Sequence, residues 1–319
     1  MISVVAGSRA KTSLVALVMA ALLALVVGCT SHGEPELPAN TDTAGIADRI
    51  TGPDGQTFLR EITTASWNDD GQRAAELFAW IPRDAQSTDR SAATRAERTA
   101  HAIASFIADE KDSIAGAPAN PALWQAYAQS LVPYLGAFVG DESGVTGFAP
   151  LDGLNSQMRR SAAVFAAMAR NSDANRIFAD AASQRARTFE AAFAKAAVAE
   201  PASADRGEAQ RNLLQAARLR SLVATGASLA DPKSDKPAVA YAQTELAYQV
   251  ASLTARPGDL HIDPNYFGNN GRLLSQSEIP DDSWSLYDSQ LTVYLAPWPA
   301  INDAIRQFGR AYGVIASGQ

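Results

Sequence analysis

Residues 154–196 read LNSQMRRSAAVFAAMARNSDANRIFADAASQRARTFEAAFAKA and carry the clearest fold signal in the chain. Their apolar residues recur in steps of four and three, which is the spacing of one face of an α-helix. The first stripe consists of Leu154, Met158, Ser161, Phe165 and Met168. A polar triplet at 171–173 follows, and the next stripe contains Phe178, Ala182, Phe189 and Phe193. Because Asn and Ser are good N-cap residues, we predict two consecutive helices that meet at this triplet.

The same periodicity extends on both sides, from about residue 43 to residue 256. Asn120 and Pro121 are typical of a helix start, and Pro133 predicts a kink in the helix that they open. The segment contains no pattern of period two that would indicate a strand. We predict an all-α domain over 43–256, an irregular array or bundle of antiparallel helices.

Residues 257–319 differ in character. Pro257 and Gly258 interrupt the helical pattern, and the chain is irregular to about residue 283 before helical spacing returns. We predict an irregular loop followed by C-terminal helices that pack on the domain. Tyr266 and Phe267 look exposed in this loop and are candidate binding residues, because loops and aromatic side chains often mediate recognition. The alternative is that both rings hold the loop down on the helices.

The N-terminal residues resemble a lipoprotein leader. Arg9 and Lys11 precede an apolar run over 13–27, which is shorter than the ~20 residues needed to span a bilayer. The run ends in Val26, Val27, Gly28 and Cys29, and this resembles the lipobox of bacterial lipoproteins. The resemblance implies a signal peptide over 1–28 and a lipid on Cys29, which is the single cysteine of the chain.

Residues 29–42 contain Pro, Gly, Ser and Glu and few apolar residues, a composition typical of a flexible tether. Two acyl chains on Cys29 would suffice for stable anchoring, since each buried methylene contributes ~0.8 kcal/mol. We therefore expect the protein at the cell membrane, on its outer, extracytoplasmic face, where the lipid is its contact with the bilayer.

Composition narrows the possible functions. Hydrophobic residues make up 47% of the 319 residues and charged residues 19%, which is ordinary for a globular protein. The formal net charge of -7 argues against binding to DNA or RNA, whose phosphates require clustered Lys and Arg. Three histidines and one cysteine leave little material for a metal site, and we expect neither a metal nor a cofactor.

Two stretches resemble a known group of proteins. One runs from Trp67 to Ile81, and the other from Asn120 to Phe148. Both are similar to mycobacterial and other actinobacterial proteins that carry a so-called TPR repeat region. The resemblance covers about 45–255 and implies a long helical protein, in some members linked with type VII secretion or toxin-like systems. The tetratricopeptide signature itself is poor here, so we expect irregular helices rather than a regular solenoid.

Two functional hypotheses remain. The first is a non-enzymatic interaction or scaffold module of the cell envelope with a protein partner, because a helical body offers faces for partner helices. The second is an extracytoplasmic hydrolase whose site combines scattered carboxylates with His101 or His261. Glu97 lies four residues before His101, and Asp263, Asp281 and Asp282 follow His261. The nucleophile, zinc-protease and nucleotide motifs are all missing from the sequence, which favours the first hypothesis.

Overall fold

The computed structural model describes residues 34–141, 143–145, 147–233 and 238–318, and the chain from Glu36 onward forms a unit of its own. Within this described part every regular element is a helix, and no β-strand is present. Phe267 and Leu273 form an isolated antiparallel bridge. The prediction of an all-α fold is therefore confirmed for the described residues.

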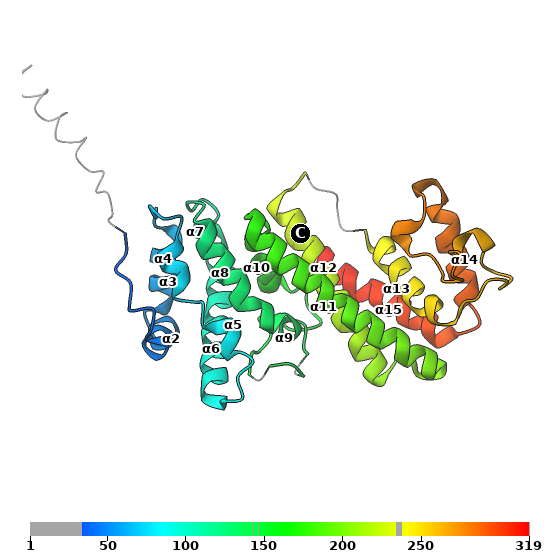
Figure 1. The fold of residues 1–319 in the computed structure, drawn as a ribbon, viewed down its shortest axis with the longest axis horizontal. Coiled ribbons are helices and arrows are strands. Elements are labelled where there is room, and N and C mark those ends of the chain that lie inside the picture. The colour runs from blue at the N-terminus through cyan, green and yellow to red at the C-terminus, as the bar shows by residue number, and fades with distance from the viewer. Residues whose placement is uncertain (1–33, 142, 146, 234–237, 319) are drawn as a thin grey trace, which may run out of the picture. The chain divides into compact units, whose positions relative to one another are not determined.

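The helices follow one another along the chain and vary widely in length (Figure 1). The α-helices are α2 (Thr43–Thr51), α3 (Gly55–Thr64), α4 (Gln72–Glu76), α5 (Ile81–Asp84), α6 (Arg90–Asp109), α7 (Lys111–Ile114), α8 (Pro121–Leu131), α9 (Leu135–Phe138), α10 (Arg159–Ala169), α11 (Ser172–Ala199), α12 (Gly207–Ala230), α13 (Val239–Thr254), α14 (Trp284–Leu295) and α15 (Pro299–Ala316). Short 3₁₀ turns are η1 (Val132–Tyr134), η2 (Pro201–Ser203), η3 (Pro264–Tyr266), η4 (Gln276–Glu278) and η5 (Asp281–Ser283).

Local chemistry explains several helix ends. Asn171 caps α11 as predicted, because its side-chain oxygen accepts a hydrogen bond from the Ala174 amide. Asn120 precedes α8 but acts differently from the expected cap: its amide donates to the carbonyls of Thr63 and Ala65 and so ties α8 to the end of α3. Pro133 lacks an amide proton, and at this point the helix gives way to η1 and then α9.

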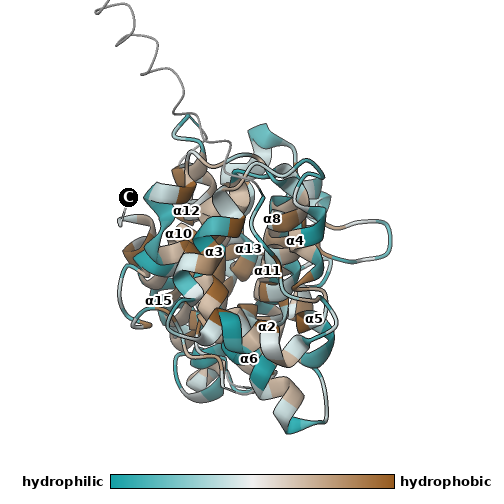
Figure 2. Ribbon diagram, turned by 90° about the vertical axis from the view of Figure 1, so that its left-hand side faces the viewer, coloured by the Kyte–Doolittle hydropathy of each residue, from teal (hydrophilic) through white to brown (hydrophobic). Residues whose placement is uncertain are grey.

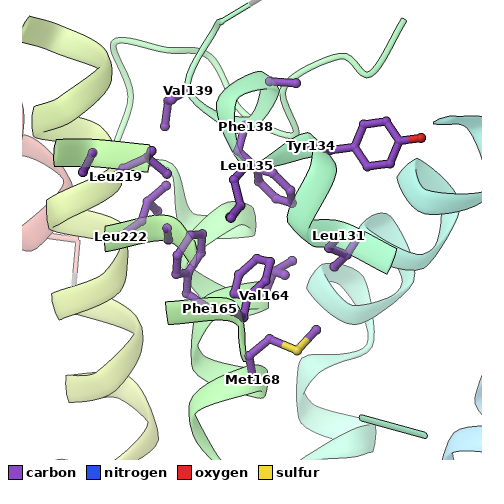
Figure 3. Packing of buried hydrophobic residues seen from close by; sticks show 14 of the residues in the cluster. Leu131, Tyr134, Leu135, Phe138, Val139, Val164, Phe165, Met168, Leu219 and Leu222 are labelled. Carbon is purple, nitrogen blue, oxygen red and sulfur yellow. The ribbon is translucent and has the colours of Figure 1, made fainter. Parts of the chain in front are cut away.

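Buried side chains of α9, α10 and α12 lie close together in one part of the core (Figure 3). The ring of Phe165 lies 4.8 Å from that of Phe178 and 6.3 Å from that of Phe138, between ring centroids. Gly226 of α12 lies against the backbone of Phe165 and Ala166, and a Cβ atom there would lie 2.5 Å from the Cβ of Phe165. Only glycine permits this approach, so Gly226 sets the distance between α10 and α12.

α12 packs against α10, α11 and α15, so it is buried on more than one side. α15 (red in Figure 1) runs beside α12 and brings the C-terminal segment back to the middle of the array. α6 shows the usual pattern of a surface helix: its hydrophobic residues face inward, and hydrophilic stretches recur along it (Figure 2).

The first described residues make contacts of their own. Residues 29–33 of the expected tether lie outside the described part. Leu37 is half-buried against the core, and the Asn40 amide donates to a carboxylate oxygen of Glu76 at 2.9 Å.

Candidate functional site

The predicted anchor lies outside the described residues. Val26, Val27, Gly28 and Cys29 all fall within residues 1–33, so lipidation stays a prediction from the sequence. Across 34–141, 143–145, 147–233 and 238–318, no helix is both long enough and apolar enough to cross a membrane.

His101 and Glu97 lie on α6 beneath the loop that carries Gly147 and Phe148. The His101 ring meets the Phe148 ring edge to face, with 5.1 Å between centroids. Burial lowers the pKa of His101, and the charge of Arg160 lowers it further. Burial raises the pKa of Glu97, which Arg98 partly opposes. Both shifts favour the neutral forms of His101 and Glu97, because burial under the loop disfavours the charged forms.

No catalytic arrangement follows from this placement. Among the described residues, Glu97 and His101 do not hydrogen-bond to each other, although they are one helical turn apart. A general base would need such an orienting partner, or a substrate proton within hydrogen-bond reach. The packing of His101 against Phe148 accounts for its position without any reaction.

The second candidate set is not gathered into a pocket. His261 is exposed, and so are Asp281 and Asp282. The Asp263 side chain caps η3 by accepting a hydrogen bond from the Asn265 amide at 2.8 Å. Within the part of the chain that the structure describes, no three His, Cys, Asp or Glu residues come together in a way that could hold a metal ion.

The expectation that Tyr266 is exposed is wrong. Only 7% of its surface is accessible, its ring packs edge to face on Tyr287 at 4.9 Å, and its hydroxyl donates weakly to the Ser283 carbonyl. Phe267 is half-buried and packs against the core. Burial raises the pKa of Tyr266, and Asp263 and Asp282 add to this effect. The two rings therefore hold the loop on the helices, as the alternative interpretation proposed.

A buried ion pair is a feature that the sequence patterns did not reveal to us. Arg220 of α12 donates through Nε and Nη2 to the two carboxylate oxygens of Glu190 on α11, at 2.7 and 2.8 Å. Glu190 is completely buried. The sequence did contain an indication that Glu190 is buried, because this residue lies at helical spacing between Ala186 and Phe193 on the buried stripe of α11. The pair joins the two longest helices, and we assign it a structural role.

The most unusual surface lies on α14. Five residues of this helix are exposed, and none of them is charged: Ser285, Leu286, Ser289, Thr292 and Val293. We call this set the outer face of α14. A surface helix ordinarily presents charged residues to water. Here the single charged residue, Asp288, instead accepts a hydrogen bond from Thr244 of α13.

The outer face of α14 is more apolar than its composition suggests. The Ser289 hydroxyl donates to the Ser285 carbonyl at 2.8 Å, and the Thr292 hydroxyl donates to the Asp288 carbonyl at 3.0 Å. Two of its three hydroxyl groups thus bond to the helix's own backbone. Leu286 and Val293 are 55% and 50% exposed and lie seven residues apart, on the same side of the helix.

The exposed apolar residues of the described chain are unevenly distributed. Every large hydrophobic residue with substantial exposure lies at or after residue 229: Leu229, Tyr241, Leu253, Leu260, Leu286, Val293 and Val314. In the described part of residues 34–228, every large hydrophobic residue is buried or half-buried. The sequence feature that could have located this surface is the low charge of residues 284–295, which contain one charged residue in a helix at the surface.

Comparison with protein-family models, with curated proteins and with solved structures finds no match to this chain.

Proposed function

We propose that this chain is a lipid-anchored, extracytoplasmic protein of the cell envelope that acts as an interaction module, and that the outer face of α14 is its docking surface. The anchor rests on the lipobox-like Val26 to Cys29 sequence. The docking surface rests on one observation: a surface helix whose exposed residues are all uncharged. The partner that fits such a face is a protein segment with an apolar stripe, such as an amphipathic helix.

Energetics supports this assignment. Leu286 and Val293 expose apolar area to water that the fold does not use, and burying it contributes roughly 25 cal/mol per Å². Tyr287, Leu291 and Leu295 supply the buried side of α14, whereas Leu286 and Val293 are about half exposed. A partner that covers the outer face of α14 would gain this free energy without disturbing the fold.

The hydrolase alternative has less support. His101 is packed under Phe148, and His261 is exposed and has no carboxylate hydrogen-bonded to it among the described residues. Neither histidine therefore has the oriented carboxylate that a general base requires.

The docking surface is testable by photo-crosslinking in the cells that make the protein. A photoreactive amino acid replaces Leu286 or Val293 in the full chain, and a matched control places it at Thr94, an exposed position on α6. We expect a discrete adduct from positions 286 and 293 but not from position 94. Equal adducts from all three positions, or none, would contradict the assignment.

The anchor has a separate test. A Cys29→Ala variant should lose incorporation of a fatty-acid analogue and should no longer sediment with membranes. Continued labelling of that variant would disprove lipidation at Cys29, and it would leave the result at α14 unaffected.

A further inference from the structure

A cavity of about 400 Å³ opens between α7, α10, α12 and the end of α15. Its volume lies in the range of small-molecule sites. Three cationic side chains line it, Lys111, Arg159 and Arg170, together with one acidic side chain, Asp112. The local formal charge is therefore positive, although the whole chain is acidic.

Among the described residues, none of the three cations has an acidic partner. Neighbouring Arg160 forms an ion pair with Asp109 at 2.8 Å, whereas no ion pair joins Lys111, Arg159 or Arg170 to a described residue. The Nε of Arg159 donates to the side chain of Gln157, which lines the same cavity. The basic groups are thus held at the opening without being neutralised.

Thr225 supplies a second, independent observation. It lines the cavity from α12, only 2% of its surface is exposed, and its hydroxyl has no hydrogen-bond partner. Threonines elsewhere in the helices behave differently: Thr51, Thr64 and Thr99 each donate to the carbonyl four residues earlier. A buried hydroxyl without a partner is costly, so a bound ligand that supplies one would remove that cost.

We propose that this cavity binds a phosphate monoester, with the phosphate held by Arg159, Arg170 and Lys111 and a polar group of the ester bonded to the Thr225 hydroxyl. Arginine pairs with phosphate through parallel hydrogen bonds, and lysine adds a point charge. A phosphate monoester carries a charge of about −1.5 to −2 near pH 7, which offsets the excess of cations over Asp112. Ala162 and Ala166 line the inner wall and leave room for a small organic part.

The same phosphate chemistry occurs in soluble sugar or glycerol phosphates and in the headgroup of phosphatidic acid. Calorimetric titration of the full-length protein in detergent separates the two sources. The probes are glycerol 3-phosphate and dihexanoyl phosphatidic acid, with inorganic phosphate as the bare anion. Tighter binding of glycerol 3-phosphate would assign a soluble ester, and tighter binding of the short-chain lipid would assign a headgroup; either supports the cavity as a phosphate site.

Variants test the residues. Arg159→Gln with Arg170→Gln should weaken binding of the preferred probe by roughly tenfold or more, because two charge-assisted contacts are lost. The matched control is Arg90→Gln with Arg98→Gln, which removes two arginines from a separate groove between α2 and α6 and should leave the affinity unchanged.

Thr225→Val removes the hydroxyl but keeps the shape. It should weaken binding several-fold while the thermal midpoint stays constant or rises, because an unsatisfied buried group is gone. The proposal is overturned if neither ester binds the wild-type protein, or if the double arginine variant binds as tightly as the wild type. It is also overturned if Thr225→Val lowers stability and leaves the affinity unchanged.

Discussion

α10 and α14 look alike in sequence and have opposite environments. Residues 161–168 of α10 carry no charge, and α14 carries one charge in twelve residues. The structure buries every residue from Ser161 to Met168, whereas α14 buries only Tyr287, Leu291 and Leu295. The fold therefore explains why residues 161–168 of α10 lack charge. It does not explain α14, and that difference is the reason for proposing a partner there.

The largest effect is expected from the buried helix. Phe165→Ala should lower the free energy of unfolding by roughly 3–5 kcal/mol, because the ring contacts Phe138 and Phe178 and leaves a cavity when removed. Chemical denaturation of the wild type and the variant measures the difference. A change below ~1 kcal/mol would mean that this side of α10 is not enclosed, and the comparison with α14 would fail.

The ion pair between α11 and α12 tests whether a buried charge depends on its partner, again through the free energy of unfolding. Arg220→Ala should destabilise the protein by about 3–5 kcal/mol, because it leaves the buried Glu190 carboxylate without its partner. The control is Glu190→Leu with Arg220→Met, which removes both charges and keeps most of the volume. This double variant should be clearly more stable than the single one. Equal stability of the single and double variants would show that other polar groups or water solvate the Glu190 carboxylate when Arg220 is absent.

The outer face of α14 should behave in the opposite way. Leu286→Ser with Val293→Ser should change the free energy of unfolding by about 0.5 kcal/mol or less per site, since both side chains are half exposed. The same double variant should lose the crosslinked partner, when the photoreactive residue is placed at the neighbouring position 289. A large loss of stability would show that the face belongs to the core after all.

The smallest effect is expected on α6, a surface helix that does carry charge. Burial raises the pKa of Glu97, so the folded protein loses stability as pH rises from 4.5 through that raised value. The thermal midpoint of a Glu97→Gln variant, measured relative to that of the wild type, should therefore increase as pH rises from 4 to 7.

Glu110 provides the control of opposite sign. Arg60 donates two hydrogen bonds to its carboxylate and lowers its pKa, so its contribution is present above pH 4.5 and is lost as pH falls. Glu110→Gln should therefore lose stability relative to the wild type as pH rises over the same range. If both variants shifted in the same direction, the burial of Glu97 would not be the cause.

Helical spacing was enough to predict most of the architecture. The stripe through Phe178 is buried as expected, and Asn171 caps α11. The stripe through Phe165 is buried from Met158 onward, but Leu154 is only half-buried and lies before α10 begins at Arg159. Such features depend on residues within a few positions of each other, so a single sequence reveals them. Tyr266 shows the limit of this reasoning: its Gly- and Asn-rich surroundings indicated exposure, but the ring packs on Tyr287, a contact that no local pattern encodes.

The candidate sites were harder to predict from the sequence than the helices were. The cavity brings Lys111, Arg159, Arg170 and Thr225 together from three helices that are separated by long stretches of chain. The Glu190–Arg220 pair spans thirty positions, and Asp288 of α14 is satisfied by Thr244 of α13. None of these partners lies within one helical turn of the other, so periodicity alone could not pair them.

The amino-acid sequence alone predicted the all-α class and the cap between α10 and α11, because propensity, capping and apolar spacing act within one turn of a helix. Lipidation of Cys29 stays a prediction from the sequence. Tertiary structure decided which apolar helices are enclosed. α10 and α14 have similar hydrophobic content, but the close approach at Gly226 encloses the first, and no described element covers the outer face of the second. Burial depends on what packs against a helix, and that is a property of the whole fold.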